Sequence, residues 1–292
     1  MTPTSLFLIM TATIASLVSI GALTTESAYA EKKNKIEGDD NNNTIVGTPE
    51  DDFIDSKGGN DTVFGDTNIG DGSGDDKINS GDGNDFNLGD TAFGHGSGDD
   101  KIDSGEGNDF NGGDAFIGDG SGDDKIKSGD GRAVNLGDTN IGDGSGDDKI
   151  SSGDGDDSNA GDARVGDGSG DDKINSGDGD DQNLGDVAVG DGSGDDKISS
   201  GKGDDENFGD TFVLDGSGDD KIKSGHGNDI NTGDTEFGDS SGDDKISSGK
   251  GDDENSGNGG ADKFNCGQGE DTITDFNEAE GDKASGNCEG VD

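Results

Sequence analysis

The chain has 292 residues, 60 of them glycine, and its 70 acidic residues against 20 Lys and Arg give a formal net charge of −50. Apolar residues make up only 23% of the chain, about half the usual share, which excludes an ordinary globular core. Such a composition is typical of disorder, unless counter-ions cancel the charge and a regular repeat folds with little core. The charge also excludes nucleic acid as an expected partner and favours cations.

Residues 1–30 have the pattern of a secretory signal peptide. Residues 5–23 are almost wholly apolar or small, and Ala28-Tyr29-Ala30 is a small-x-small cleavage motif. An uncleaved membrane anchor is the alternative, because the run approaches the minimum spanning length. After cleavage no later segment could span a membrane. We therefore expect a secreted protein, extracellular or at the cell surface, where calcium is available at millimolar levels.

Residues 47–256 form a 24-residue repeat, which is the dominant feature of the sequence. The motif Gly-Ser-Gly-Asp-Asp-Lys-Ile places Ile78 and its copies at every twenty-fourth position as far as Ile246, the last copy beginning Ser-Ser-Gly. A divergent copy, GTPEDDFID, places Ile54 in the same register, which makes nine units. Each unit divides into two nine-residue pieces and one six-residue piece, for example Asp71–Asn79, Ser80–Leu88 and Gly89–Gly94.

The two nine-residue pieces resemble the RTX, or hemolysin-type calcium-binding, nonapeptide G-G-x-G-x-D-x-U-x, in which U is a large aliphatic residue. Residues 38–46 and 257–274 resemble the same nonapeptide. We therefore assign residues 31–46 to an N-terminal cap or first divergent repeat, and residues 257–292 to C-terminal repeats and a cap. The resemblance implies that the loop Asp and loop carbonyls of two stacked turns bind one Ca²⁺ between them.

The residues themselves favour the same architecture. Glycines permit the strained backbone of tight loops, and the apolar residue two positions after each loop Asp starts a short strand that points inward. The sequence therefore predicts an all-β parallel β-solenoid, a β-roll or β-helix of about nine 24-residue coils, with strands stacked about 4.8 Å apart. We expect three sides, near residues 77–79, 86–88 and 91–93, because position 93 and its copies form an apolar column. A two-sided roll with six residues bulging out is the alternative.

Two columns of Asp are the expected Ca²⁺ ligands, since hard oxygen ligands in flexible loops favour calcium. The first loops supply Asp52, Asp76, Asp100, Asp124, Asp148, Asp172, Asp196, Asp220 and Asp244. The second loops supply Asp61, Asp85, Asp109, Asp157, Asp181, Asp205, Asp229 and Asp253, and the C-terminal repeats add Asp262 and Asp271. Ala133 replaces Asp in one second loop, beside Arg132, so we expect a missing or weak site there, with the guanidinium pairing in place of the ion. The intact gaps of the two columns predict fourteen calcium ions.

Three further columns have no assigned equivalent in that family. Asp90 and its copies follow a corner glycine, and we favour a structural role there over a further calcium role. A second acidic column begins at Asp71, with His95 as a tolerated replacement in one copy. Asn87 and its copies stand where the family has an aliphatic residue. We favour an inward-facing amide ladder for them over an outward amide array.

The two cysteines, Cys266 and Cys288, lie near the C-terminus and predict one disulfide, with two free thiols as the alternative. No catalytic constellation is found. We expect a non-enzymatic calcium-binding protein that folds on binding Ca²⁺. One alternative is an adhesion or coat protein that contacts the cell surface or extracellular matrix through outward phenylalanines, Phe86, Phe110, Phe116 and Phe212. Another is a binder of ice or mineral that uses the Asn or Asp arrays.

Overall fold

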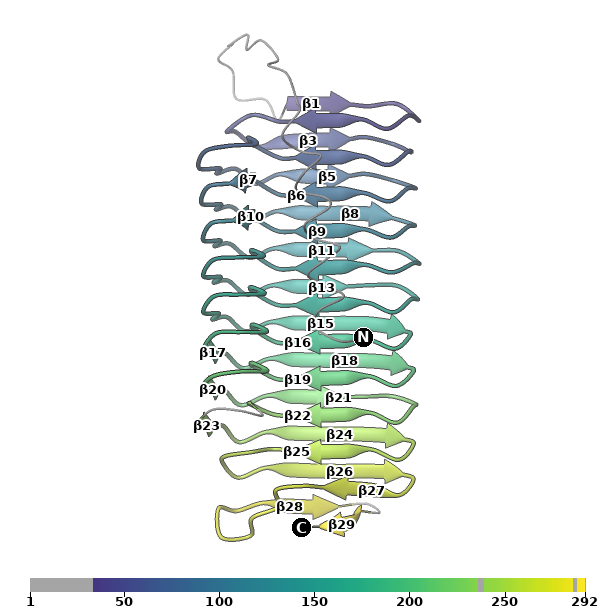
Figure 1. Cartoon of the computed structure of the whole chain (residues 1–292), viewed down its shortest axis with the longest axis vertical. Coiled ribbons are helices and arrows are strands. Elements are labelled where there is room, and N and C mark those ends of the chain that lie inside the picture. The colour runs from purple at the N-terminus through teal and green to yellow at the C-terminus, as the bar shows by residue number, and fades with distance from the viewer. Residues whose placement is uncertain (1–33, 236–238, 286–287, 292) are drawn as a thin grey trace. The chain divides into compact units, whose positions relative to one another are not determined.

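A computed structural model of the chain describes residues 34–235, 239–285 and 288–291, with backbone only for 289–291. The expected signal peptide lies outside the described residues. Within them the chain consists of short strands joined by loops and contains no helix. Every strand pair is parallel, and the strands stack coil upon coil (Figure 1). The predicted all-β parallel β-solenoid is therefore confirmed.

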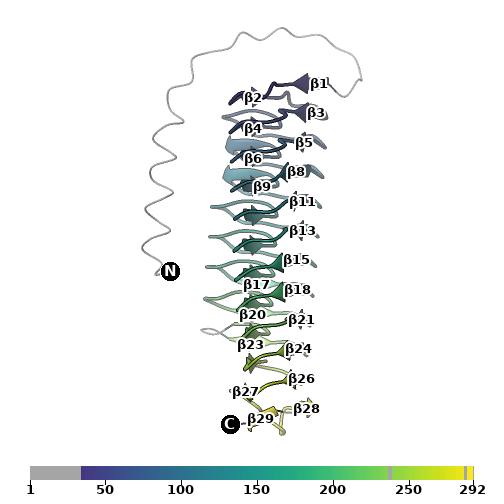
Figure 2. The same cartoon turned by 90° about the vertical axis from the view of Figure 1, so that its right-hand side faces the viewer.

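Two continuous sheets of twelve strands form the body of the solenoid, and Figure 2 shows them side by side. Sheet A contains β1 (Asn34–Glu37), β3 (Asp52–Asp55), β5 (Lys77–Asn79), β8 (Lys101–Gly105), β11 (Lys125–Ser128), β13 (Lys149–Ser151), β15 (Lys173–Asp178), β18 (Lys197–Lys202), β21 (Lys221–Lys223), β24 (Lys245–Lys250), β26 (Lys263–Gln268) and β28 (Lys283–Ser285). Sheet B contains β2 (Thr44–Val46), β4 (Thr62–Phe64), β6 (Phe86–Leu88), β9 (Phe110–Gly112), β12 (Val134–Leu136), β14 (Ser158–Ala160), β16 (Gln182–Leu184), β19 (Glu206–Phe208), β22 (Ile230–Thr232), β25 (Glu254–Ser256), β27 (Asp271–Ile273) and β29 (Cys288–Val291).

The solenoid extends beyond the nine 24-residue coils that the repeat predicts. Ile36 of β1 pairs with Ile54, and Ile246 of β24 pairs with Phe264, each across a step of 18 residues. Phe264 in turn pairs with Ala284 across 20 residues. Segments assigned from the sequence to a cap or divergent repeat at the N-terminus, and to repeats and a cap at the C-terminus, thus continue both sheets. The 18-residue coils lack the six-residue piece, which shows that two nine-residue pieces suffice for one turn of this solenoid.

The six-residue piece forms a third side that is only partly strand. Strands β7 (Thr91–Phe93) and β10 (Ala115–Ile117) pair with each other, and single bridges such as Val165↔Val189 continue the side. A short sheet of β17 (Gly192–Ser193), β20 (Gly216–Ser217) and β23 (Ser240–Ser241) lies in the following loops. The three predicted sides are therefore present, but the third has the discontinuous pairing expected of the bulging alternative.

The column at position 93 does not face a core, contrary to the expectation from its apolar character. Ile69, Phe93 and Val165 are 40–74% exposed. Thr91 and its later copies are buried within the loop side instead, whereas Thr67 is half-buried, and Phe116 packs on Phe86 and Phe110 of sheet B. Positions 91 and 93 would share one face of a regular strand, so their different exposure shows that the third side does not keep regular strand alternation. Apolar character alone could not reveal that irregularity.

The phenylalanines on and beside sheet B pack on one another. Most of the ring surface expected to mediate adhesion is therefore covered. Phe86 and Phe110 stack with ring centroids 5.0 Å apart, and Phe116, which is buried, lies 5.5–5.7 Å from both. Phe212 contacts Phe208 at 5.1 Å and keeps 37% of its surface exposed. The expectation of four outward rings is wrong for Phe116 and holds in part for Phe212.

The interior between the two sheets is half apolar and half polar. Ile54, Ile78 and the copies as far as Ile246 form a single buried column from sheet A. Opposite them, Asn87 and its copies on sheet B are buried and bond coil to coil, for example Asn87 Nδ2 to Asn111 Oδ1 at 3.0 Å. The amides from Asn87 to Asn231 also donate to a serine hydroxyl, as Asn87 does to Ser80 at 2.9 Å. The inward amide ladder is confirmed.

A substitution that breaks this ladder is expected to lower the free energy of unfolding more than a substitution at the neighbouring outward-facing residue. Asn183 accepts from Asn159 at 2.9 Å, and donates to Asn207 at 2.9 Å and to Ser176 at 3.0 Å. Asn183→Leu leaves these partners buried and unpaired, at about 1–3 kcal/mol for each group. Gln182→Leu, one residue away on the exposed face, is the matched control and should change stability by less than about 0.5 kcal/mol. Equal urea midpoints for the two variants would show that the ladder does not stabilise the fold.

Candidate metal centre

All nineteen Asp residues predicted as ligands are buried. In both columns one oxygen of each carboxylate except that of Asp52 accepts a backbone N–H from the preceding coil, while Asp52 accepts the N–H of Thr48 in its own coil. The N–H of Asp52 donates to Asp76 Oδ1 at 2.7 Å, and the N–H of Asp61 donates to Asp85 Oδ1 at 2.8 Å. The second oxygen of Asp76 and of Asp85 has no hydrogen-bond partner among the described residues. Each column therefore joins consecutive coils and keeps one oxygen for another ligand.

A third buried column stands next to the first, and from the sequence a calcium role there was only the alternative to a structural one. Asp66, Asp90, Asp114, Asp138, Asp162, Asp186, Asp210 and Asp234, here called the corner column, are at most 1% exposed. Each follows the corner glycine that ends a sheet B strand. A serine N–H seven residues further on donates to Oδ2 of Asp66, Asp90, Asp114 and Asp138, so the structural role expected of this column is present in these four members. The sequence could not predict where the second carboxylate oxygen of each corner Asp points.

First-loop and corner Asp residues converge in groups of three. One oxygen from each member lies within 4.8 Å of the others, a separation that a single ion can bridge. Among the described residues, seven groups of three or more acidic, His or Cys residues lie this close together, and five of them are Asp66–Asp76–Asp90, Asp90–Asp100–Asp114, Asp114–Asp124–Asp138, Asp138–Asp148–Asp162 and Asp162–Asp172–Asp186. The repeat contains a sign of this convergence, since an Asp follows the corner glycine in each unit. It does not indicate the direction in which the side chain of that Asp points.

The oxygens that these groups present are unpaired. Asp76 Oδ2, Asp66 Oδ1 and Asp90 Oδ1 have no hydrogen-bond partner in the described part of the chain, and the same atoms recur in the next group. A buried carboxylate without a partner is costly, and three together repel one another. Hard carboxylate oxygens are the ligands that Ca²⁺ prefers. The groups therefore fit a divalent cation by charge and by donor type.

The electrostatic cost of these groups appears in their pKa values. Burial, with repulsion from neighbouring carboxylates, raises the pKa of Asp76 to about 8 and of Asp90 to about 9. Burial and the charge of Asp124 raise the pKa of Asp100 well above its usual range. In the second column burial raises the pKa of Asp109 to about 6 and of Asp205 to about 7. Without a cation, the carboxyl groups of the first and corner columns are therefore harder to ionise than those of the second column.

The coil in which Ala133 replaces the second-loop Asp lacks one carboxylate of the second column. Ala133 offers no carboxylate to the N–H of Asp109, although its own N–H donates to Asp157 Oδ1 at 2.7 Å. Burial raises the pKa of Asp157 to about 6, and the charge of Arg132 opposes that rise. Within the described residues Arg132 forms no ion pair shorter than 4 Å, so it acts at longer range than the direct pairing expected from the sequence.

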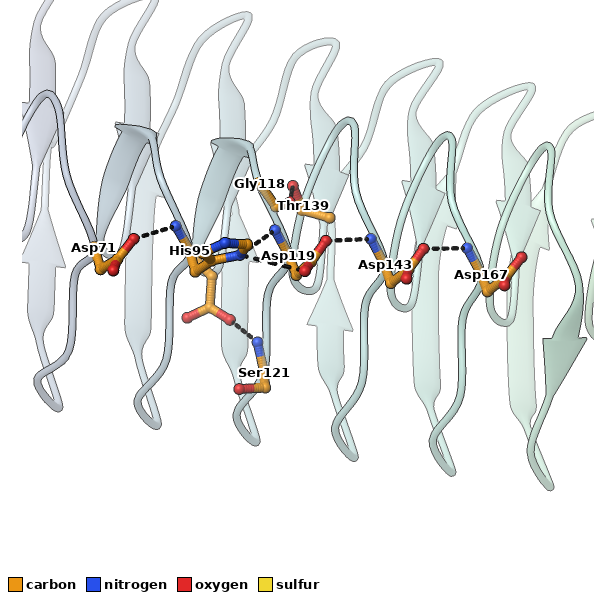
Figure 3. A network of polar contacts seen from close by, with 9 residues as sticks. Asp71, His95, Gly118, Asp119, Ser121, Thr139, Asp143 and Asp167 are labelled. Atoms are coloured by element: carbon orange, nitrogen blue, oxygen red, sulfur yellow. Dashed lines mark hydrogen bonds and ion pairs between the residues drawn. The ribbon is translucent and has the colours of Figure 1, made fainter.

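An exposed acidic row runs outside the groups of three. In Figure 3 the N–H of His95 donates to Asp71 Oδ1 at 3.2 Å, and the N–H of Asp119 donates to His95 Nδ1 at 3.2 Å. The row continues with the N–H of Asp143 donating to Asp119 and that of Asp167 donating to Asp143. His95 thus replaces an Asp as backbone acceptor, as expected of a tolerated loop residue.

This row lines a groove of about 1090 Å³ along residues 71–241. Glycines form its floor directly over the corner column. A Cβ added to Gly72 would lie 2.6 Å from the Cβ of Asp90 and 2.9 Å from Asp66 Oδ2. The groove therefore separates solvent from the corner carboxylates by one glycine backbone, and its mouth carries negative charge that attracts cations.

The C-terminal coils are linked covalently. A disulfide joins Cys266 and Cys288, whose Cα atoms are 5.3 Å apart. Cys266, Phe264 and Ile273 are buried in the main core cluster, and Phe276 packs against them. Asp262 continues the first column, since its Oδ1 accepts the N–H of Asp244 at 2.9 Å, and Asp271 continues the second by accepting from Asp253 at 3.0 Å.

Comparisons of the chain with protein-family models, with curated proteins and with solved structures find no match. Among the residues described, no helix has the length and apolar character needed to cross a membrane. The chain is a repeat β-solenoid with stacked Asp and Asn ladders.

Proposed function

We propose that this chain is an exported, non-enzymatic calcium-binding protein whose solenoid folds on Ca²⁺ bound between its coils. One observation carries the proposal: buried carboxylates meet in groups of three with oxygens that have no partner. Ca²⁺, when bound, supplies the positive charge that these oxygens lack. The resemblance of the loops to the RTX nonapeptide supports the same ion, and the signal-peptide pattern implies a compartment where calcium is plentiful.

In this proposal the binding energy of the ion becomes folding energy. A 24-residue unit buries one Ile of the sheet A column and, in several units, one more large apolar residue at the position of Leu88, each worth about 1.5–3 kcal/mol. Ordering the backbone of the same unit costs about 1 kcal/mol or more per residue. A ligand that binds only the folded chain stabilises it by mass action. Cations held between coils would therefore offset the repulsion of a chain with a formal charge of −50.

Isothermal titration calorimetry of the chain after chelation tests the proposal. Ca²⁺ is expected to bind with a heat that includes folding, and Mg²⁺ at the same concentration is expected to bind more weakly, because it demands octahedral geometry and dehydrates reluctantly. Na⁺ at equal ionic strength is the control for screening. The absence of any saturable calcium binding, or equal folding with Na⁺, would contradict the function.

A second candidate function rests on the exposed acidic row. Asp71, Asp119, Asp143 and Asp167 present carboxylates at the coil spacing on the outer face (Figure 3), as a calcium mineral surface would require. The Asn array is buried and is withdrawn from this role. Calcite adsorption should fall for the double variant Asp143→Asn with Asp167→Asn. Unchanged adsorption would remove this candidate.

A further inference from the structure

The groups of three are not separate from one another. Asp90 belongs both to the group around Asp76 and to the group around Asp100. Asp114 and Asp138 are shared between neighbouring groups in the same way, whereas each first-loop Asp belongs to a single group. The groups therefore form one continuous row along the solenoid axis, with corner carboxylates at the joints.

The charge of this row matches one divalent cation per coil. Each 24-residue unit contributes one first-loop Asp and one corner Asp, two negative charges in all. Both are buried: Asp90 is fully inaccessible and Asp76 is 2% exposed. Each has an oxygen without a hydrogen-bond partner among the described residues, and the two residues belong to the same group of three. A monovalent ion would leave one charge per coil, and two divalent ions would overcharge the row.

We propose that tightly bound cations occupy a single file, one per 24-residue unit, with each corner carboxylate bridging two neighbouring ions. This inference rests on the proposed calcium function and narrows it. Seven groups give about seven tight Ca²⁺ ions, half the fourteen expected when the two loop columns bind independently. The second column contributes one carboxylate per coil and forms weaker sites.

Because corner carboxylates are shared between neighbouring groups, similar Asp→Asn substitutions are predicted to remove different numbers of calcium ions. Asp138 joins two groups, so Asp138→Asn removes about two tight ions. Asp148 belongs to one group, so Asp148→Asn removes about one. Asp157 lies in the second column, so Asp157→Asn removes none of the tight ions. All three changes replace a buried Asp by an amide of the same shape, which makes them matched controls for one another.

Equilibrium dialysis with elemental analysis measures these numbers on the full chain, at a free calcium that saturates the unaltered protein. Circular dichroism on each sample verifies that the strands are intact. The expected order of calcium content is Asp157→Asn equal to the unaltered protein, then Asp148→Asn, then Asp138→Asn. Equal losses from all three variants, or about fourteen tight ions in the unaltered protein, would overturn the single file while leaving calcium binding in place. No bound calcium at all would instead overturn the function.

A gain-of-residue variant and a spectroscopic probe avoid dependence on damaged proteins. Ala133→Asp completes the second column and is expected to leave the number of tight ions unchanged; an increase by one or two would contradict the single file.

Loading the unaltered chain with Mn²⁺ places ions about one coil spacing, roughly 4.8 Å, apart. Electron paramagnetic resonance should then show exchange-broadened signals from coupled ions. A resolved six-line spectrum of isolated Mn²⁺ at full loading would contradict the single file.

Discussion

In excess chelator, lowering the pH from about 8 to about 5 is expected to fold the solenoid, with a large rise in the strand signal of far-ultraviolet circular dichroism. Burial raises the pKa of Asp76 to about 8, of Asp90 to about 9 and of Asp244 to about 8. In the unfolded chain such carboxyls titrate near 3.9. The folded state therefore binds more protons than the unfolded state between these values, and protonation stabilises it.

The sign of this dependence follows from the raised pKa values. The stabilising contribution is fully present below the unfolded pKa and is lost as the pH rises through the folded pKa. A one-unit shift in each of ten such carboxyls is worth about 14 kcal/mol, as much as the whole stability of an ordinary domain, about 5–15 kcal/mol. Saturating calcium is the control: the strand signal should then be complete at about pH 8. A strand signal in chelator that stays flat or falls on acidification would show that the buried carboxyls do not oppose folding.

Gly113→Ala is expected to destabilise the calcium-loaded solenoid by about 3 kcal/mol, the upper end of the usual cost of overpacking, since a tight interior forces the backbone to move. A Cβ at Gly113 would overlap Asp124 Oδ2 and the carbonyl oxygen of Gly137. The first of these atoms is an unpartnered oxygen of a group of three. The same substitution should therefore also weaken calcium binding.

Gly112→Ala, at the adjacent residue, is the matched control. Its Cβ would approach the Cδ2 of Leu88 at 2.9 Å, the end of a flexible side chain, and Ala160 already occupies this column in another coil. The change is expected to stay within about 1 kcal/mol of the unaltered protein, because alanine also reduces the entropy of the unfolded chain. Urea unfolding in saturating calcium compares the two variants. Similar midpoints would mean that the coils are not in close contact at the corner.

The strict repeat made most of the fold predictable. Stacking puts like residues above like, so one reading of Lys77–Asn79, Phe86–Leu88 and Thr91–Phe93 located the strands of every coil. The Asn ladder followed from the same logic, because a column of amides can satisfy its own hydrogen bonds only when it is in register. The terminal segments were assigned to a divergent repeat or cap and to C-terminal repeats and a cap, but the 24-residue period did not count them as coils because they omit the six-residue piece.

The ligand arrangement was less predictable, for a geometric reason. Asp76 and Asp90 are 14 residues apart, and their approach depends on how the third side closes onto the loop of the next coil. That closure also decided that Thr91 faces inward and Phe93 outward, which hydrophobicity alone did not reveal. A repeat pattern reports which residues stack upon their copies, but not which columns face each other across a corner.

Far-ultraviolet circular dichroism of the chain during a calcium titration at about pH 7.5 tests the central claim most directly. In excess chelator the spectrum is expected to be that of an unordered chain, and calcium should convert it cooperatively to the spectrum of parallel strands. The midpoint should coincide with the midpoint of calcium uptake. A complete strand spectrum in excess chelator at this pH, unchanged by calcium, would contradict the claim that cations fold this solenoid.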